Sequence, residues 1–255
     1  MNALHSHEHF EMYFQIEGDR SYFRDNKFYK LTHNTLVVDA PNVLHKYEGG
    51  PYTRILLGFD NDYLSPYQID YLYQLSQEEI LQFSPSDMDN ILKILNEMMQ
   101  IDSSSYKNRN LQLSLSLGSL LHTIYNIKEY KHIKPLILTA ITHLHNEQIM
   151  PIVLQIMDYI KTNYNKKISL TELSNKYSIS KTWICKCFQK FNNITVFQYK
   201  TLCQINEAKI LLKKSYSIKK IAHWVGFSSS QHFSKVFKSL NGCTPTRWKT
   251  KKDFS

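Results

Sequence analysis

The first sixty residues alternate between short apolar runs and turn-forming residues. β-Branched and aromatic side chains gather in five runs, each bounded by Gly, Asn, Asp or Pro, over residues 10–18, 20–25, 27–31, 34–41 and 53–60. Runs of this length with such boundaries are typical of strands in an antiparallel sandwich or small barrel. The pattern therefore predicts a β domain over residues 1–66.

After Pro66 the apolar spacing changes to that of helices. Residues 87–100 and 151–164 carry apolar side chains three and four positions apart. Residues 111–127 fit the same spacing, although their first positions alternate and would also suit a strand. We therefore expect an α+β fold with two domains. The β domain would be followed by a helical region over 67–150, and residues 151–255 would form an all-α domain.

The last third of the chain contains an internal repeat. Ser180 and Ser229, both good N-cap residues, each precede an apolar stripe at helical spacing. The two stripes are Ile184, Cys187, Phe188 and Phe191, and Phe233, Val236, Phe237 and Leu240. Residues that tolerate the left-handed conformation end these helices and threonines cap the next ones, at Asn193 and Thr195, and at Gly242 and Thr244. Corresponding positions are 49 residues apart, so we expect two similar amphipathic helices.

A shorter helical segment precedes each of these helices. "LTELSNKY" (170–177) ends at Ser178, and "SIKKIAHWV" (217–225) ends at Gly226. Ser174 and Ala222 are small residues that let two crossing helices come close. A short helix, a tight turn, a serine cap and a second amphipathic helix together describe a helix-turn-helix. The chain is predicted to contain two such units, with Phe227 filling the core behind the second turn.

The outward faces of the two repeated helices are polar. If the apolar stripes face inward, the exposed residues are Lys181, Thr182, Cys185, Lys186 and Gln189 in the first helix, and Ser230, Gln231, Ser234, Lys235 and Lys238 in the second. Such groups suit base edges and phosphates in a major groove. One helix over about residues 197–212 would set the two faces roughly 34 Å, or one DNA turn, apart. An ordinary hydrated surface is the alternative for each face.

The net charge of +9 is unevenly distributed. Residues 151–255 carry 19 Lys and Arg against four acidic residues, whereas residues 1–150 carry 12 basic and 18 acidic residues. A basic domain joined to an acidic one indicates that one part binds a polyanion. Double-stranded DNA is therefore the expected partner of the C-terminal domain.

Cysteine usage and the N-terminal sequence favour a cytoplasmic protein. All four cysteines lie after residue 184, and no second pair accompanies Cys185 and Cys187, so we expect reduced thiols and no zinc site. The chain starts without a basic, apolar signal sequence, and it has no run of about 18 apolar residues. No membrane association is expected.

Residues 152–250 resemble the DNA-binding domain of AraC/XylS-type transcription regulators. The matching segments are "ISLTELSNKYSIS", "QINEAKILL" and "IKKIAHWVGFSSSQHFSKVFKSLNGCTPTRW". The resemblance implies base-reading positions at Thr182, Cys185, Lys186, Ser230, Gln231, Ser234 and Lys235. Gln204 stands where the family usually has arginine, so the polar contact that arginine would make within the domain is not expected to be kept. Asn193 replaces a frequent glycine and should be tolerated.

The N-terminal segment resembles the two cupin motifs. His5, His7 and Glu11 stand in the first motif and His45 in the second, and alternation on a strand would place them on one face with His9. The resemblance implies a cupin-like antiparallel β-barrel over residues 1–66, with a pocket for a small-molecule effector at His5, His7, Glu11 and His45. A metal is not expected, because Asn34 replaces a motif glycine and no glycine precedes His45.

The family likeness also implies that the helical region over 67–150 serves for dimerisation or as a linker, with a homodimer face at residues 87–130, and that RNA polymerase is a candidate partner. Packing within the domain is the alternative for the helices of 87–130. For the whole protein there are two alternatives: a metal-dependent cupin enzyme with a basic domain that localises it on DNA, and an architectural DNA binder without sequence preference or effector.

Overall fold

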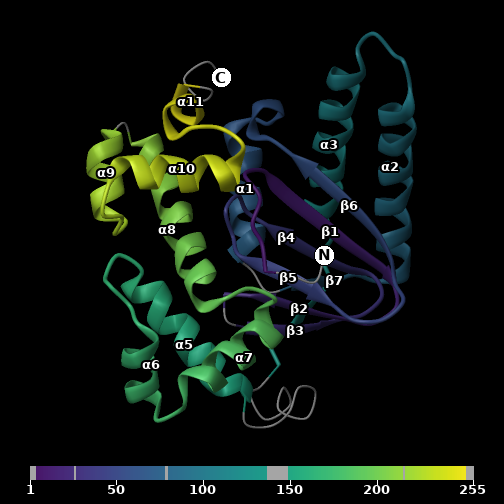
Figure 1. The fold of residues 1–255 in the computed structure, drawn as a ribbon. Coiled ribbons are helices and arrows are strands. Elements are labelled where there is room, and N and C mark those ends of the chain that lie inside the picture. Colours follow the sequence, from purple (N-terminus) through teal and green to yellow (C-terminus); the bar gives the residue numbers. More distant parts are fainter. Residues whose placement is uncertain (1–3, 26, 78–79, 137–148, 215, 251–255) are drawn as a thin grey trace. The chain divides into compact units, whose positions relative to one another are not determined.

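The protein folds into two compact units, Met1–Ile137 and Leu138–Ser255. This computed structural model describes residues 4–25, 27–77, 80–136, 149–214 and 216–250. The first unit combines antiparallel sheets with helices, and the second consists of helices (Figure 1). The expected α+β class with two domains is confirmed.

Two antiparallel sheets form the N-terminal unit. The five-stranded sheet has the order β6 (Thr53–Phe59), β1 (Phe10–Glu17), β4 (Thr35–Asp39), β7 (Ile80–Gln82) and β8 (Lys131–Ile133). The three-stranded sheet has the order β3 (Lys27–Leu31), β2 (Arg20–Arg24) and β5 (His45–Glu48). Within the described residues no ladder of strands joins the edges of one sheet to those of the other, so the expected closed barrel is not formed. Among the described residues, one isolated bridge, His5 to His45, adds to these pairings.

The central strand β1 is buried on both faces. Phe10, Met12 and Phe14 pack against helices, whereas Tyr13 lies in a cluster that joins β1 and β4 to the three-stranded sheet. The helices are α1 (Pro66–Gln77), α2 (Pro85–Ser103) and α3 (Arg109–Tyr125), and a short 3-10 helix, η1 (Asn61–Tyr63), precedes them. In Figure 1 α2 and α3 run side by side next to β6. Because neighbours cover both faces, β1 is apolar at most positions instead of alternating.

Five strands and two helices of this unit follow the sequence prediction closely. The elements that the pattern did not reveal are β5, β7, β8, α1 and the short η1. The three strands have only three or four residues each, too few for alternation to be visible. Helix α1 buries only Leu72 and Leu75, so its apolar spacing is weak.

The C-terminal unit contains seven helices among its described residues. They are α5 (Ile149–Asn163), α6 (Leu170–Tyr177), α7 (Lys181–Asn192), α8 (Val196–Lys213), α9 (Ile218–Trp224), α10 (Ser230–Asn241) and α11 (Pro245–Thr250). Each expected helix is present within a few residues of its predicted limits. Helix α8 connects the α6–α7 pair to the α9–α10 pair (Figure 1). In the part of the chain that the structure describes, no helix has the length and apolarity needed to cross a bilayer.

Candidate functional site

Side-chain caps and left-handed turns define both helix pairs of the C-terminal unit. The Ser180 hydroxyl accepts a hydrogen bond from the Trp183 amide, and the Ser229 hydroxyl accepts one from the His232 amide. The turns themselves are left-handed, with φ of 55° at Ser178 and 86° at Gly226. At the other ends, φ is 56° at Asn193 and 72° at Gly242, and Thr195 and Thr244 cap the helices that follow. The predicted double helix-turn-helix pattern is confirmed.

The two turns are built differently. In the first, the Ser174 hydroxyl donates a hydrogen bond of 2.6 Å to the Ile179 carbonyl, which ties the turn to α6. In the second, Ala222 is buried at the corresponding place, and the segment between the two helices is two residues longer. Phe227 sits in that turn, edge-to-face with Phe233 at 5.4 Å between ring centroids. A side-chain hydrogen bond therefore holds the first turn in place, whereas the packing of aromatic rings holds the second.

The apolar stripes face inward, with one exception. Ile184, Cys187, Phe188 and Phe191 are buried in α7, as are Phe233 and Phe237 in α10. Val236 is half-buried, and Leu240 is 48% exposed, so its prediction as a core residue is wrong. The two helices differ in burial because they have different neighbours. Helix α5 packs against α7, whereas α10 contacts α9 and the short α11.

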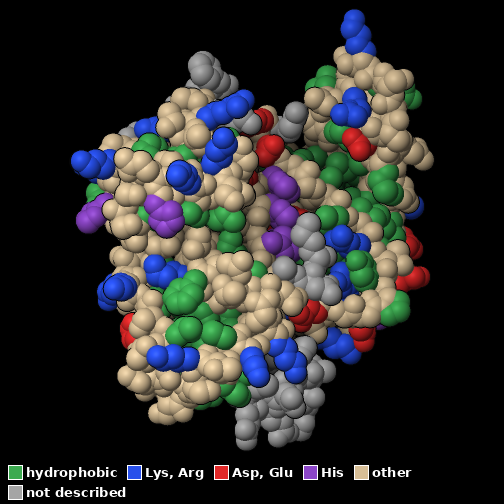
Figure 2. All heavy atoms as spheres, viewed as in Figure 1, with side chains coloured by type: hydrophobic (Ala, Val, Ile, Leu, Met, Phe, Trp, Pro, Cys, Tyr) green, Lys and Arg blue, Asp and Glu red, His purple; other side chains and the backbone are tan. Residues whose placement is uncertain are grey.

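The predicted DNA-facing residues lie on the outer faces of α7 and α10. Lys181, Thr182, Cys185 and Lys186 are exposed in α7, and Gln231, Lys235 and Lys238 are exposed in α10. Ser230 and Ser234 are half-buried. Figure 2 shows Lys and Arg side chains spread over the visible face of the helical unit. Each helix-turn-helix thus presents one polar, cationic helix face to solvent.

The core behind the second turn contains a buried amide. Gln204 of α8 is 5% exposed and donates a hydrogen bond of 2.7 Å to the Val225 carbonyl, at the C-terminus of α9. The expectation that this position loses its polar contact is therefore wrong. The amide of glutamine is long enough to reach a carbonyl that the end of a helix leaves without an intrahelical partner.

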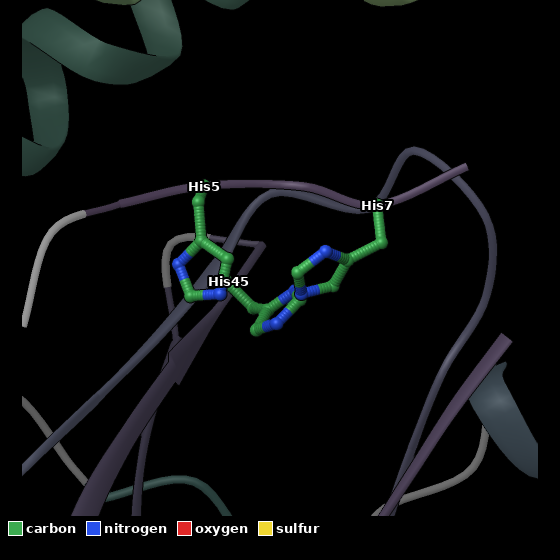
Figure 3. Close-up of side chains that lie close together, drawn as sticks. All are labelled: His5, His7 and His45. Carbon is green, nitrogen blue, oxygen red and sulfur yellow. The ribbon is translucent and has the colours of Figure 1, made fainter. Parts of the chain in front are cut away.

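Three histidines meet at one end of the space between the sheets. The ring of His5 lies 4.6 Å from that of His45 and 4.9 Å from that of His7, centroid to centroid. Figure 3 shows the three side chains close together, and Figure 2 shows a column of histidine side chains at the surface. His9 stacks on His7 at 4.9 Å. The backbone bridge between His5 and His45 brings the two sequence motifs together.

Two buried carboxylates complete this histidine cluster. Glu11 lies 3.1 Å from His7 Nε2 and 3.6 Å from His45 Nε2. Asp39 lies 3.8 Å from His45 Nε2, accepts hydrogen bonds from the Tyr22 and Tyr47 hydroxyls, and is 3.7 Å from Arg24. The sequence analysis did not select Asp39. Its position at the end of β4 among apolar residues was the available signal, because a buried acid needs a partner.

The donors of this cluster fit a divalent cation. The side-chain nitrogens of His5, His7 and His45 lie within 4.8 Å of one another, and Glu11, Asp39 and His45 form a second such group. His7 Nε2 and His45 Nε2 are buried and lack a hydrogen-bond partner. Imidazole and carboxylate donors in such a set suit zinc, iron or manganese. The donors would equally receive a polar small molecule.

The cluster also predicts how the stability of the sheet unit depends on pH. Burial raises the pKa of Glu11, but the nearby imidazoles of His45 and His7 outweigh it and hold that pKa far below 4.5. Burial lowers the pKa of His45, whereas the charge of Asp39 and the nearby carboxylate of Glu11 raise it, and the net pKa lies above 6.5. The depressed carboxyl pKa stabilises the fold above pH 4.5, and the raised imidazole pKa stabilises it below pH 6.5.

We therefore expect the unfolding free energy of this unit to be highest between pH 4.5 and 6.5 and to fall on either side. Urea titrations across pH 3–9, as a rough range, would measure it. In Glu11→Gln the unfolding free energy should fall less steeply below pH 4.5, and in His45→Gln it should fall less steeply above pH 6.5. An acid side that is equally steep in Glu11→Gln would contradict the assignment.

The C-terminal unit has relatives among described proteins. A family model described as a helix-turn-helix domain matches residues 173–251. The Msm operon regulatory protein of Streptococcus mutans is 28% identical over 112 residues, which are 43% of this chain and 40% of that protein. The uncharacterized HTH-type transcriptional regulator YdiP of Escherichia coli is 34% identical over 95 residues, 37% of this chain and 31% of that protein. The chain thus spans less than half the length of these two curated relatives.

Among the solved structures that resemble part of the chain is a probable AraC family transcriptional regulator from Rhodopseudomonas palustris. It is 23% identical, with a TM-score of 0.38, over 40% of this chain and 96% of that one. The family match covers the second helix-turn-helix unit, the α8 connection and all of the first unit except the first three residues of α6 and its cap. The chain therefore carries a helix-turn-helix domain over residues 173–251.

Proposed function

We propose that the protein is a cytoplasmic, sequence-specific regulator of transcription that binds double-stranded DNA through two helix-turn-helix units. One observation carries the proposal: two helices with the same cap-and-turn geometry each bury an apolar stripe and expose a polar, cationic face. These faces belong to a region in which basic residues far outnumber acidic ones. A helix of this kind, held by a second helix across a tight turn, enters the major groove of DNA.

On each exposed face, different side chains would supply affinity and sequence preference. Lysines at the ends of each face would contact phosphates, which gives affinity that falls with salt. The shorter polar side chains between them would contact base edges, which gives sequence preference. The base-reading set is Thr182, Cys185 and Lys186 in α7, and Ser230, Gln231, Ser234 and Lys235 in α10. Lys181 and Lys238 would contact phosphate.

Selection from fragmented genomic DNA, followed by footprinting, tests the proposal directly. We expect the purified chain to enrich an asymmetric site with two protected major grooves about 10 bp apart. Equal retention of all fragments at one salt concentration would instead indicate binding that does not depend on sequence, and would contradict the proposal.

Gln231→Ala should relax specificity at one base position. Gln231 is exposed on α10, and its amide suits a bidentate pair with adenine, so the preferred site should lose about 1–3 kcal/mol of discrimination. Competition binding against single-base variants of the selected site measures this. Ser239→Ala, on the same helix and outside the proposed face, is the matched control. An unchanged base profile in Gln231→Ala would remove Gln231 from the base-reading set.

Lys238→Ala should weaken binding to every DNA sequence by the same factor. The Lys238 ammonium is exposed near the end of α10, where a phosphate contact carries no base information. The slope of log affinity against log salt should become smaller by about 0.9. Affinities for the selected site and for an unrelated duplex, measured over a salt series, give the answer. A loss confined to the selected site would indicate a base contact instead.

In this proposal the sheet unit binds a small-molecule effector. The chain forms a homodimer, and the DNA-bound dimer contacts RNA polymerase. The histidine cluster supports the sensing role because His7 Nε2 and His45 Nε2 are buried donors or acceptors without a hydrogen-bond partner. A polar ligand placed among His5, His7, Glu11 and His45 would satisfy them. The paired helices α2 and α3 expose Met99, Leu111 and Leu115, which supports a dimer surface there.

A metal-dependent cupin enzyme is the second candidate. The convergence of His5, His7 and His45 favours it, since their nitrogens could hold one divalent ion together. A bound ion would polarise an oxygen of a substrate. Metal analysis of the purified chain distinguishes the candidates: stoichiometric metal together with failure to enrich any DNA sequence would favour the enzyme.

A further inference from the structure

Two arginines in the sheet unit, Arg20 and Arg54, have no carboxylate partner among the described residues, and Arg24 provides the comparison. Arg20 and Arg24 point into the space between the sheets from the same strand, β2, and are similarly buried at 4% and 6% exposure. Arg24 is 3.7 Å from Asp39 and donates to the Val38 carbonyl. Arg20 has no such ion pair among the described residues, and its Nε is buried without a hydrogen-bond partner.

The carboxylates nearest to Arg20 in the sequence are engaged elsewhere. Asp19 pairs with Lys30 at 2.9 Å, and Glu17 accepts a hydrogen bond from the Thr53 hydroxyl at 3.1 Å. Glu48, on the neighbouring strand β5, pairs with Lys46 at 2.9 Å. The charge of Arg20 therefore stays uncompensated within the described chain, and an unpaired charge removed from water is costly.

A second guanidinium lies near the first, around one tyrosine ring. The guanidinium carbon of Arg20 is 3.9 Å from the ring centroid of Tyr52, and that of Arg54 is 5.8 Å from the same centroid. Arg54, on β6, is half-buried and also has no ion pair in the part of the chain that the structure describes. Tyr52 is 40% exposed, so the pair of cations lies just below the surface.

Aromatic rings line the remaining sides of this arginine pair. Arg20 is 5.9 Å from the Tyr47 centroid and Arg54 is 5.4 Å from the Tyr13 centroid, and these two tyrosines stack at 4.1 Å. The Tyr13 hydroxyl donates to Gln15, whose amide donates to the carbonyls of Glu17 and Gly18. The polar atoms around the pair are thus donors or already occupied acceptors. A ligand that matches them carries an anionic group and an apolar body.

We propose that Arg20 and Arg54 form a binding site for a small organic carboxylate, separate from the histidine cluster at the other end of the same space. The carboxylate would accept hydrogen bonds from the two guanidinium groups, which suit planar anions. The apolar part would lie against the tyrosine rings, and the exposed Tyr52 ring would move to admit it. The site belongs to the sheet unit and does not depend on DNA binding.

Calorimetric titration of the full chain with acetate, hexanoate, benzoate and inorganic phosphate tests the site. We expect hexanoate or benzoate to bind once per chain and more tightly than acetate or phosphate. Arg20→Met and Arg54→Met should each weaken binding about tenfold or more, because each removes a charge-assisted hydrogen bond. Lys27→Met removes an exposed cation on β3 that lies outside the proposed site, and it should leave binding unchanged.

The outcomes are separable. No binding by the organic acids, or equal binding by wild type and both arginine variants, would overturn the site. Phosphate bound as tightly as the organic acids would overturn the ligand class. If Arg20→Met does not fold, Arg54→Met decides, because Arg54 is half-buried on β6 and its truncation leaves no buried charge. His45→Gln should retain the organic acid, which distinguishes this site from the histidine cluster.

Discussion

Gly226→Ala should unfold the C-terminal unit more readily than any other single-methyl change in its turns. Gly226 has φ of 86°, and a Cβ built there would lie 2.4 Å from the Asn165 carbonyl oxygen. An alanine would be strained in this left-handed backbone conformation, and its Cβ would push the α9–α10 turn away from Asn165, which follows α5. These two effects together should cost about 3–5 kcal/mol of unfolding free energy.

Tryptophan fluorescence in urea measures this loss in the right unit, because the three tryptophans all lie after residue 182. Gly242→Ala is the matched control. Gly242 also has a positive φ, of 72°, but nothing lies within 4 Å of its added Cβ, so only about 1–2 kcal/mol of backbone strain is expected. Equal losses in the two variants would show that the approach of Asn165 does not constrain the turn. A destabilised turn should also abolish DNA binding before the protein unfolds, since α10 would lose its orientation.

Asp39→Leu should destabilise the sheet unit by about 3–5 kcal/mol. Asp39 is 1% exposed, accepts hydrogen bonds from Tyr22 and Tyr47, and lies 3.7 Å from the buried Arg24. Its removal leaves a guanidinium in the protein interior without its carboxylate and two hydroxyls without an acceptor. Hydrogen exchange of the β1 and β4 amides reports on this unit alone, and their protection should fall accordingly.

The double variant Arg24→Met with Asp39→Leu separates the charge from the packing. When both charges are removed, the pair no longer leaves an unpaired ion, so the double variant should be more stable than Asp39→Leu alone. Strictly additive losses would mean that Asp39 and Arg24 do not interact. Asp39→Asn, which keeps one acceptor oxygen for the tyrosines, should lie between wild type and the leucine variant.

The sequence by itself determined the local structure of the C-terminal unit. Serine and threonine caps mark where each helix begins. Residues in the left-handed conformation mark where helices end: Ser178, Asn193, Gly226 and Gly242. The two apolar stripes indicate which face of each helix is buried. These signals act within a few residues, through side chain to backbone bonds and through the period of the helix, so they can be read without the fold. The same period gave the exposed faces of α7 and α10.

Only the tertiary structure decided which residues meet between the sheets and which apolar residues stay exposed. Leu240 has the spacing of a core residue but no helix to cover it, and Gln204 finds its acceptor twenty-one residues away at Val225. Asp39 joins Glu11 and His45 because β4 and β5 belong to different sheets that face each other. Arg20 and Arg24 look alike in the sequence, and only the positions of distant carboxylates make one a paired cation and the other a candidate anion site. Such pairings depend on strand order and register, which residue spacing along one chain does not encode.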